Sequence, residues 1–131
     1  MLVLHWRWPR PQLIPYPYHL VGVLPLLAGL ALTSQGATQF DRVGTNIKTF
    51  GEPDHFVTEG LFHVSRNPMY LGMVLALSGA AMLLGSLAVW LTVLTFFVVT
   101  DRWYIAFEER VMQRKFGRRY TTYCAQVRRW L

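Results

Sequence analysis

The 131-residue chain is poor in charge and in cysteine. Charged residues make up 15% of it, against about a quarter in an average soluble domain, and none lies between Arg66 and Asp101. The single cysteine, Cys124, excludes an internal disulfide and any site built from several cysteines. The four histidines lack the spacing of metal ligands, so we expect no metal site. Nucleotide-binding glycine loops, His-x-x-x-His pairs and G-x-S-x-G motifs are also missing, which removes common signatures of soluble enzymes.

Hydrophobic residues make up 53% of the chain and are grouped in long runs, which excludes intrinsic disorder. The uncharged runs predict three transmembrane helices, at about residues 17–38, 68–84 and 87–106. We therefore expect an all-α fold in one domain. It is an integral membrane helical bundle with a connecting loop at 41–67 and an amphipathic C-terminal tail at 108–131.

Several residues mark helix ends. Asn67 is a favoured N-cap type, Pro68 suits the first helical position, and Gly85 predicts a tight turn between two helices. Gly117 is expected to end the helix that continues from the third span. Pro25 lies inside the first span, where a kink can form.

Two helical faces carry a pattern. Small residues recur every four positions in the second span, as in closely packed membrane helices: Gly72, Ala76 and Ala80. Apolar and aromatic residues share one face of the tail, which predicts a helix lying in the membrane interface: Tyr120, Tyr123, Val127 and Trp130.

The basic residues orient the bundle. Two of the 13 precede the first span, three lie in the loop at 41–67, and eight lie between Arg102 and Arg129. An odd number of spans places the loop and the tail on one side, and the positive-inside rule makes that side the cytoplasm of an inner-membrane protein. A basic tail next to an apolar block favours membrane lipids over nucleic acid as its partner. A cleaved signal peptide is the alternative for the first run, but no small-x-small site follows it.

Two segments stand out: GLFHVSRNPMYLG at 60–72 and EERVMQRKFGRRYTTYCAQVRRW at 108–130. Their order and separation by a helical hairpin resemble the isoprenylcysteine carboxyl methyltransferase and phospholipid methyltransferase superfamily, as do Arg42, Gly44 and Thr45. The resemblance implies a small membrane enzyme that uses S-adenosylmethionine and methylates a lipophilic substrate taken from the bilayer. Family members commonly carry a further N-terminal span, and residues 1–6 look like the trailing end of one. In a homodimer, a helix of the second copy could take the place of that span in the bundle.

The resemblance implies a site at the loop–helix junction. Arg66 is expected to pair with the carboxylate of the cofactor or with a substrate anion, near the positive end of the helix that begins at Pro68. Its alternative is snorkelling among headgroups. Asn67 is most simply an N-cap, although it and Pro68 are also placed to contact the cofactor. Tyr70 fits a cofactor contact or the aromatic belt, and Gly72 fits close backbone approach or helix packing.

Glu108 and Glu109 complete the set of expected catalytic residues with Arg66. Carboxylates at the end of an apolar helix are costly unless they are solvated or paired. Either could hold the ribose diol or ammonium of the cofactor or act as a base, and the alternative is pairing with neighbouring basic residues such as Arg110. Tyr120 and Tyr123 match the family pattern and could close over the cofactor, with Arg128 or Arg129; membrane anchoring explains them as well.

The expected reaction is direct in-line methyl transfer, promoted by alignment and desolvation. Two other functions fit the composition. One is a non-catalytic membrane protein that keeps the fold, and the other is a membrane reductase acting on a sterol or isoprenoid. The identity of the methyl acceptor does not follow from the sequence.

Overall fold

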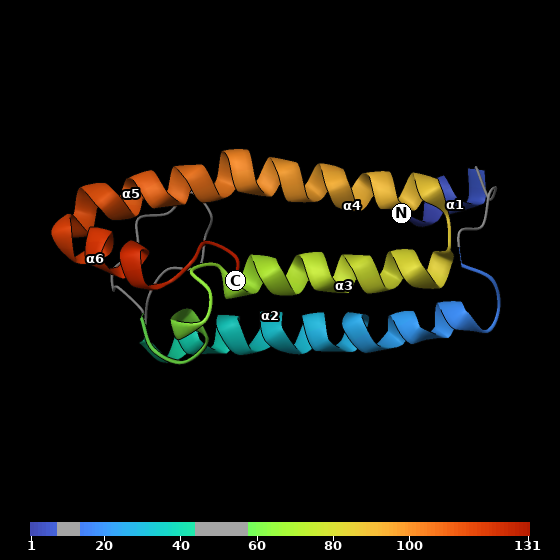
Figure 1. Cartoon of the computed structure of the whole chain (residues 1–131), viewed down its shortest axis with the longest axis horizontal. Helices are drawn as coiled ribbons and strands as arrows, with labels where there is room; N and C mark the ends of the chain where they lie inside the picture. The colour runs from blue at the N-terminus through green and yellow to red at the C-terminus, as the bar shows by residue number, and fades with distance from the viewer. Residues whose placement is uncertain (8–13, 44–57) are drawn as a thin grey trace.

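Three long helical rods lie side by side in the computed structural model, which describes residues 1–7, 14–43 and 58–131 (Figure 1). Every regular element in these described residues is a helix, which confirms the predicted all-α class. In chain order they are α1 (Leu2–Arg7), η1 (Tyr18–Gly22), α2 (Val23–Val43), η2 (Gly60–His63), α3 (Pro68–Leu84), α4 (Leu87–Val99), the π-helix η3 (Thr100–Ile105), α5 (Ala106–Phe116) and α6 (Arg118–Gln126).

The helices expose apolar surface. Two described helices are long and apolar enough to cross a membrane, Tyr18–Gln39 and Leu87–Phe116, and α3 is a shorter apolar helix. Only 17% and 22% of the most apolar windows of the two long helices are buried within the protein. Leu24 and Leu91, for example, are 69% and 58% exposed. An apolar helix that points its side chains outward is suited to lipid rather than to the core of a soluble domain.

The third rod is one continuous helix formed by α4, η3 and α5. Its 30 residues span about 45 Å, whereas the hydrocarbon layer is only about 30 Å thick. A helix of this length that crosses a membrane carries its charged part, α5, past the apolar layer. The π-helix at Thr100–Ile105 was not predicted; such insertions are frequent at functional sites.

The first rod differs from its expected form in two ways. It starts as η1 and becomes α-helical at Val23, so Pro25 lies in the first turn, where its missing N–H is not needed. The rod also continues to Val43, so Asp41 and Arg42, expected in the loop, belong to its last turn. Gly44 and Thr45 of the resemblance lie outside the described residues.

Helices α2 and α3 share the most extensive contact in the described structure. Three glycines at seven-residue spacing, Gly22, Gly29 and Gly36, form the side of η1 and α2 that meets α3. On α3, a Cβ added at Gly72 would strike Thr33 and the backbone of Gly29, so the packing role expected for Gly72 is confirmed. Further along α3, Gly79 lies at the same contact, where it meets the backbone of Gly22 and Leu26.

The helix ends follow the sequence signals closely. Helix α3 has the expected bounds, with Pro68 in its first turn. Gly85 ends it in a left-handed conformation, with φ of 63°. Gly117 ends α5 with φ of 55°, as expected.

The tail folds back onto the start of α3 (Figure 1). Tyr120, Tyr123 and Val127 are buried in a cluster with Phe62, so the interfacial role predicted for this face is wrong. Helix α6 ends at Gln126, and residues 127–131, here called the C-terminal strap, are not helical. The end of α2, the start of α3 and the tail therefore share one end of the bundle, as the parity of the spans predicted.

Tyr123 anchors this buried cluster, because its hydroxyl donates a hydrogen bond to the carbonyl oxygen of Phe62 at 2.6 Å. Replacement Tyr123→Phe leaves that buried carbonyl without its donor, so we expect the free energy of unfolding to fall by about 1–3 kcal/mol. Thermal unfolding followed by circular dichroism in detergent measures the change. Tyr16→Phe is the matched control, because Tyr16 is 78% exposed and should lose nothing measurable.

Burial also raises the pKa of Tyr123 to about 12, from an ordinary value of 10.0. The folded state holds this proton more tightly than the unfolded state does. The stabilisation is therefore complete below pH 10 and is lost as the pH rises toward 12. The free energy of unfolding, measured from pH 9 to pH 12, should decline less steeply with pH in Tyr123→Phe than in the unmodified protein. Equal slopes would contradict this linkage.

Candidate functional site

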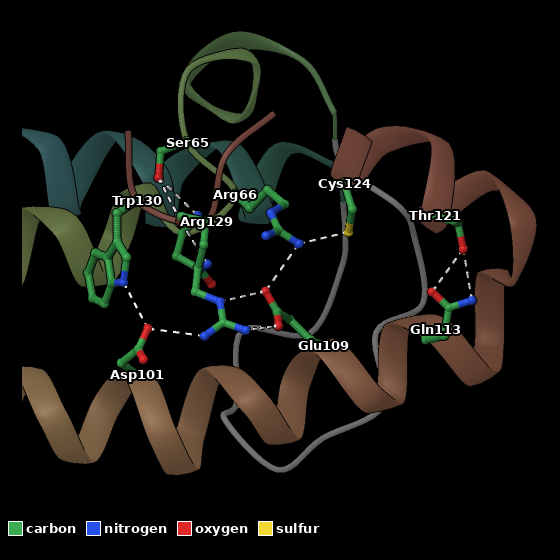
Figure 2. Close-up of polar contacts among 10 residues, drawn as sticks. Ser65, Arg66, Asp101, Glu109, Gln113, Thr121, Cys124, Arg129 and Trp130 are labelled. Atoms are coloured by element: carbon green, nitrogen blue, oxygen red, sulfur yellow. Dashed lines mark hydrogen bonds and ion pairs between the residues drawn. The ribbon is translucent and has the colours of Figure 1, made fainter. Parts of the chain in front are cut away.

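Two arginines and two carboxylates meet at the end of the bundle where α3 begins (Figure 2). Arg66 precedes α3, Asp101 lies on η3, Glu109 lies on α5, and Arg129 lies on the C-terminal strap. We call these four residues the arginine–carboxylate cluster. It joins segments 60–72 and 108–130, which the sequence predicts to form the site, with Asp101, which is not among the expected site residues.

Glu109 is the centre of the cluster. Its Oε1 lies 3.1 Å from Arg66 Nη1 and accepts a hydrogen bond from Arg129 Nε at 3.1 Å. Its Oε2 accepts a hydrogen bond from Arg129 Nη2 at 2.5 Å (Figure 2). Glu109 thus pairs with two distant arginines, not with the neighbouring basic residues of α5 that the sequence left open as its partners. Bidentate arginine pairs of this kind fix geometry as well as charge.

Arg66 is held inside the protein. Its side chain is only 15% exposed, which rules out the snorkelling alternative. Arg66 Nη1 also donates to Cys124 Sγ, whereas Arg66 Nε is buried and has no hydrogen-bond partner among the described residues. A buried donor left without an acceptor costs about 1–3 kcal/mol. Arg66 therefore retains a donor that an additional acceptor would satisfy.

Asp101 connects the strap to the third rod. Its Oδ1 accepts hydrogen bonds from Arg129 Nη1 at 3.2 Å and from Trp130 Nε1 at 2.9 Å. The ring of Trp130 also lies 4.9 Å from the ring of Phe97, centroid to centroid. The sequence did carry a signal for Asp101, because it is the first charge after a long apolar run, and ionised groups within apolar helices are usually functional.

The backbone of the strap binds the segment before α3. Arg66 N donates to the carbonyl oxygen of Arg128 at 3.0 Å, and Asn67 Nδ2 donates to that of Arg129 at 3.0 Å. Asn67 is the N-cap residue by position, but its side chain makes no capping hydrogen bond. The N-cap position predicted for Asn67 is therefore confirmed, but its side chain does not cap the helix and instead donates through Nδ2 to the strap.

Glu108 lies on a different face of α5 from Glu109. Its Oε1 accepts a hydrogen bond from the hydroxyl of Tyr70 at 2.9 Å, which joins α5 to α3. Within the described residues, no ion pair involves Glu108. The two adjacent glutamates therefore differ: Glu109 is saturated by arginines, and Glu108 is held by a neutral partner.

The remaining expected site residues lie beside the cluster or away from it. Gly72 faces α2, and Pro68 is buried in the first turn of α3. Tyr120 and Tyr123 are buried with Phe62, and burial raises the pKa of both hydroxyls, which keeps them neutral. In the part of the chain that the structure describes, no group of three His, Cys, Asp or Glu residues is placed to hold a metal ion.

Comparison with known proteins gives two matches. The family model described as phospholipid methyltransferase matches residues 17–119. An uncharacterized protein of Haemophilus influenzae is 41% identical over 63 residues, which are the whole of that protein and 48% of this chain. No solved structure matches the chain significantly. The resemblance seen in the sequence is confirmed at the level of the superfamily, whereas the match does not support the narrower isoprenylcysteine carboxyl methyltransferase assignment.

Proposed function

The chain belongs to the phospholipid methyltransferase family, and from this premise we propose that it transfers a methyl group from S-adenosylmethionine to a lipophilic or amphiphilic acceptor at the membrane surface. Family membership suggests a lipid methyltransferase in general terms, and the exposed apolar helices suggest an integral membrane protein. The observation that carries the proposal is Arg66: its side chain is only 15% exposed, it forms an ion pair with Glu109, and its buried Nε has no acceptor among the described residues.

The polar groups of this region fit the cofactor. S-adenosylmethionine carries a carboxylate, an ammonium group, a ribose diol and a sulfonium, so its site must offer both donors and acceptors. Arg66 would hold the carboxylate, because a forked, positively charged guanidinium matches the geometry of a carboxylate. Glu108 would hold the ammonium group or the ribose diol, because among the described residues it forms no ion pair. Glu109 would act through Arg66, since both of its oxygens are already bound.

When bound, the cofactor supplies a methyl group attached to a positively charged sulfur. The protein then contributes binding and orientation. The pair of Arg66 and Glu109 fixes the guanidinium, and the hydroxyl of Tyr70 fixes the carboxylate of Glu108. Buried apolar side chains beside them, such as Phe62 and Val127, exclude water. Catalysis by alignment and desolvation requires no covalent intermediate with the protein.

The site is proposed to face the cytoplasm of an inner-membrane protein. Eleven of the 13 basic residues follow the first span, as the positive-inside rule requires of the cytoplasmic side. The water-soluble cofactor would enter from that side, and the acceptor would move in laterally from the bilayer. Cysteine labelling from either side of sealed vesicles, with the label directed to an exposed tail residue such as Arg114→Cys, tests this orientation.

The function is tested by calorimetry on the purified full-length chain in detergent, with S-adenosylmethionine and its demethylated product as ligands. We expect both to bind. Incubation with membrane lipid extract and a donor carrying a radiolabelled methyl group should then transfer label to a lipid-soluble compound. A protein that binds neither ligand and labels no lipid would be the non-catalytic alternative.

A further inference from the structure

We propose that Asp101 and Trp130 are positioning residues for methyl transfer: they hold the C-terminal strap so that Arg129 fixes Glu109, and Glu109 in turn fixes Arg66. This inference rests on the proposed function. It concerns residues outside the expected site, because the sequence pattern predicts Trp130 on a helix in the membrane interface and Asp101 is not among the expected site residues.

Asp101 is placed to hold the strap firmly. Its side chain is 18% exposed, and one of its oxygens accepts hydrogen bonds from two consecutive strap residues, Arg129 and Trp130. On either side of it, Thr100 and Ile105 are 2% and 0% exposed, so η3 is packed against the protein and cannot rotate freely. The ring of Trp130 adds an apolar contact with Phe97, one turn earlier on the same rod.

Arg129 is the residue through which Asp101 acts. Its guanidinium is shared by two carboxylates: Nη1 donates to Asp101, and Nε and Nη2 donate to Glu109. A planar guanidinium bound along two edges has one orientation, whereas one bound along a single edge can swing about it. Its side chain is 35% exposed, so without Asp101 the pair with Glu109 is open to water and weaker.

The effect reaches Arg66 by two routes. Glu109 Oε1 is shared by Arg129 and Arg66, so movement of Arg129 changes the electrostatic partner of Arg66. The backbone N–H of Arg66 is also bound by the carbonyl oxygen of Arg128 in the strap. Release of the strap therefore frees both the backbone and the side chain of the residue that is proposed to hold the cofactor.

The charges support this reading. Arg66 and Arg129 are balanced by Glu109 and Asp101, so the cluster is neutral as a set. Arg102 contributes little, because its side chain is 84% exposed and its Nε lies 3.7 Å from Asp101 Oδ2. Asp101 and Arg102 are neighbours in sequence, but only Asp101 holds the strap. A substitution of Arg102 is therefore a matched control for a substitution of Asp101.

The experiment compares full-length Asp101→Asn, Asp101→Glu and Arg102→Gln proteins in detergent. We expect Asp101→Asn to weaken binding of S-adenosylhomocysteine about tenfold by calorimetry, the effect of losing one charge-assisted hydrogen bond. Asp101→Glu, which keeps the charge, should recover part of that loss. Arg102→Gln should bind as the unmodified protein does. The unfolding temperature should change little in any of them, which separates positioning from a general structural role.

A second measurement does not depend on the cofactor. Trypsin cleavage after Arg129 removes the last two residues and can be followed by intact mass. We expect it to be faster in Asp101→Asn and in Trp130→Phe, which loses only the indole N–H, than in Arg102→Gln. If Asp101→Asn does not fold, the cleavage rate of Trp130→Phe still tests whether Asp101 holds the strap.

Two results would overturn the positioning role: unchanged binding in Asp101→Asn, or Asp101→Glu binding no better than Asp101→Asn. Unchanged cleavage in both strap variants would overturn the anchoring itself. An unmodified protein that binds neither the donor nor its product would instead refute the proposed function, and the cleavage rates would still decide whether Asp101 holds the strap.

Discussion

Replacement Arg66→Gln is expected to weaken binding of S-adenosylmethionine about 100-fold, which corresponds to about 2.7 kcal/mol at 25 °C. Arg66 is the only residue of the cluster with a buried donor that lacks a partner in the described structure, and its forked, positively charged guanidinium suits the carboxylate of the cofactor. Glutamine removes the charge and the forked donor geometry together. Calorimetric titration of the purified variant measures the loss directly.

The fold should tolerate this change better than binding does. Glu109 keeps two hydrogen bonds from Arg129 after Arg66 is removed, so no buried carboxylate is left without a cation. Arg66→Lys keeps the charge but not the fork, and we expect binding intermediate between those of the glutamine variant and the unmodified protein. Arg110→Gln is the control, because Arg110 is exposed and points away from the cluster to its own helix backbone. Equal affinities in Arg66→Gln and Arg110→Gln would remove Arg66 from the site.

The meeting of Arg66 with Glu109 could be predicted from the sequence. Three apolar runs place the loop and the tail at one end of the bundle. The loop and the tail each carry a charged segment next to an apolar helix. Side chains that are costly alone at such a position are stabilised by pairing. These two facts were enough to bring together Arg66 and the two glutamates, although they did not say which glutamate pairs with the arginine.

The difference between Glu108 and Glu109 could not be predicted, because it depends on the phase of the third rod. The π-helix at Thr100–Ile105 turns more slowly than an α-helix and so rotates all of α5 relative to α4. No glycine, proline or periodicity marks this stretch of the sequence. The resulting rotation directs Glu109 toward Arg66 and Glu108 toward Tyr70.

The C-terminal strap could not be predicted from the sequence either, because its conformation also depends on distant contacts. The spacing of Tyr120, Tyr123, Val127 and Trp130 suits a helix, and the pattern is valid as far as Val127, where the buried face ends. Beyond it, the carbonyl oxygens of Arg128 and Arg129 find donors in the segment before α3. These partners lie more than 60 residues away in sequence, so local periodicity does not reveal them.

The packing of α2 against α3 gives the largest expected effect on stability. The Cβ position of Gly29 is occupied by backbone atoms of Gly72 and Ala76, which cannot move aside as a flexible side chain can. Replacement Gly29→Leu must therefore separate the two helices, and we expect a loss of about 3 kcal/mol or more in the free energy of unfolding. Thermal unfolding in detergent, followed by circular dichroism or by loss of the monodisperse peak on gel filtration, measures it.

Ala31→Leu is the matched control for that substitution, because Ala31 lies two residues further along α2 and is exposed where lipid would surround it. It adds an equally apolar side chain to the same helix without entering the contact with α3, so we expect its stability to stay near that of the unmodified protein. Similar unfolding temperatures for Gly29→Leu and Ala31→Leu would contradict the close approach of the two helices. Since Arg66 and Asn67 lie just ahead of α3, separation of α2 and α3 should also weaken cofactor binding, whereas Arg66→Gln should weaken binding without a comparable loss of stability. The two substitutions therefore distinguish a site that fails because its scaffold has moved from one that fails because its donor has gone.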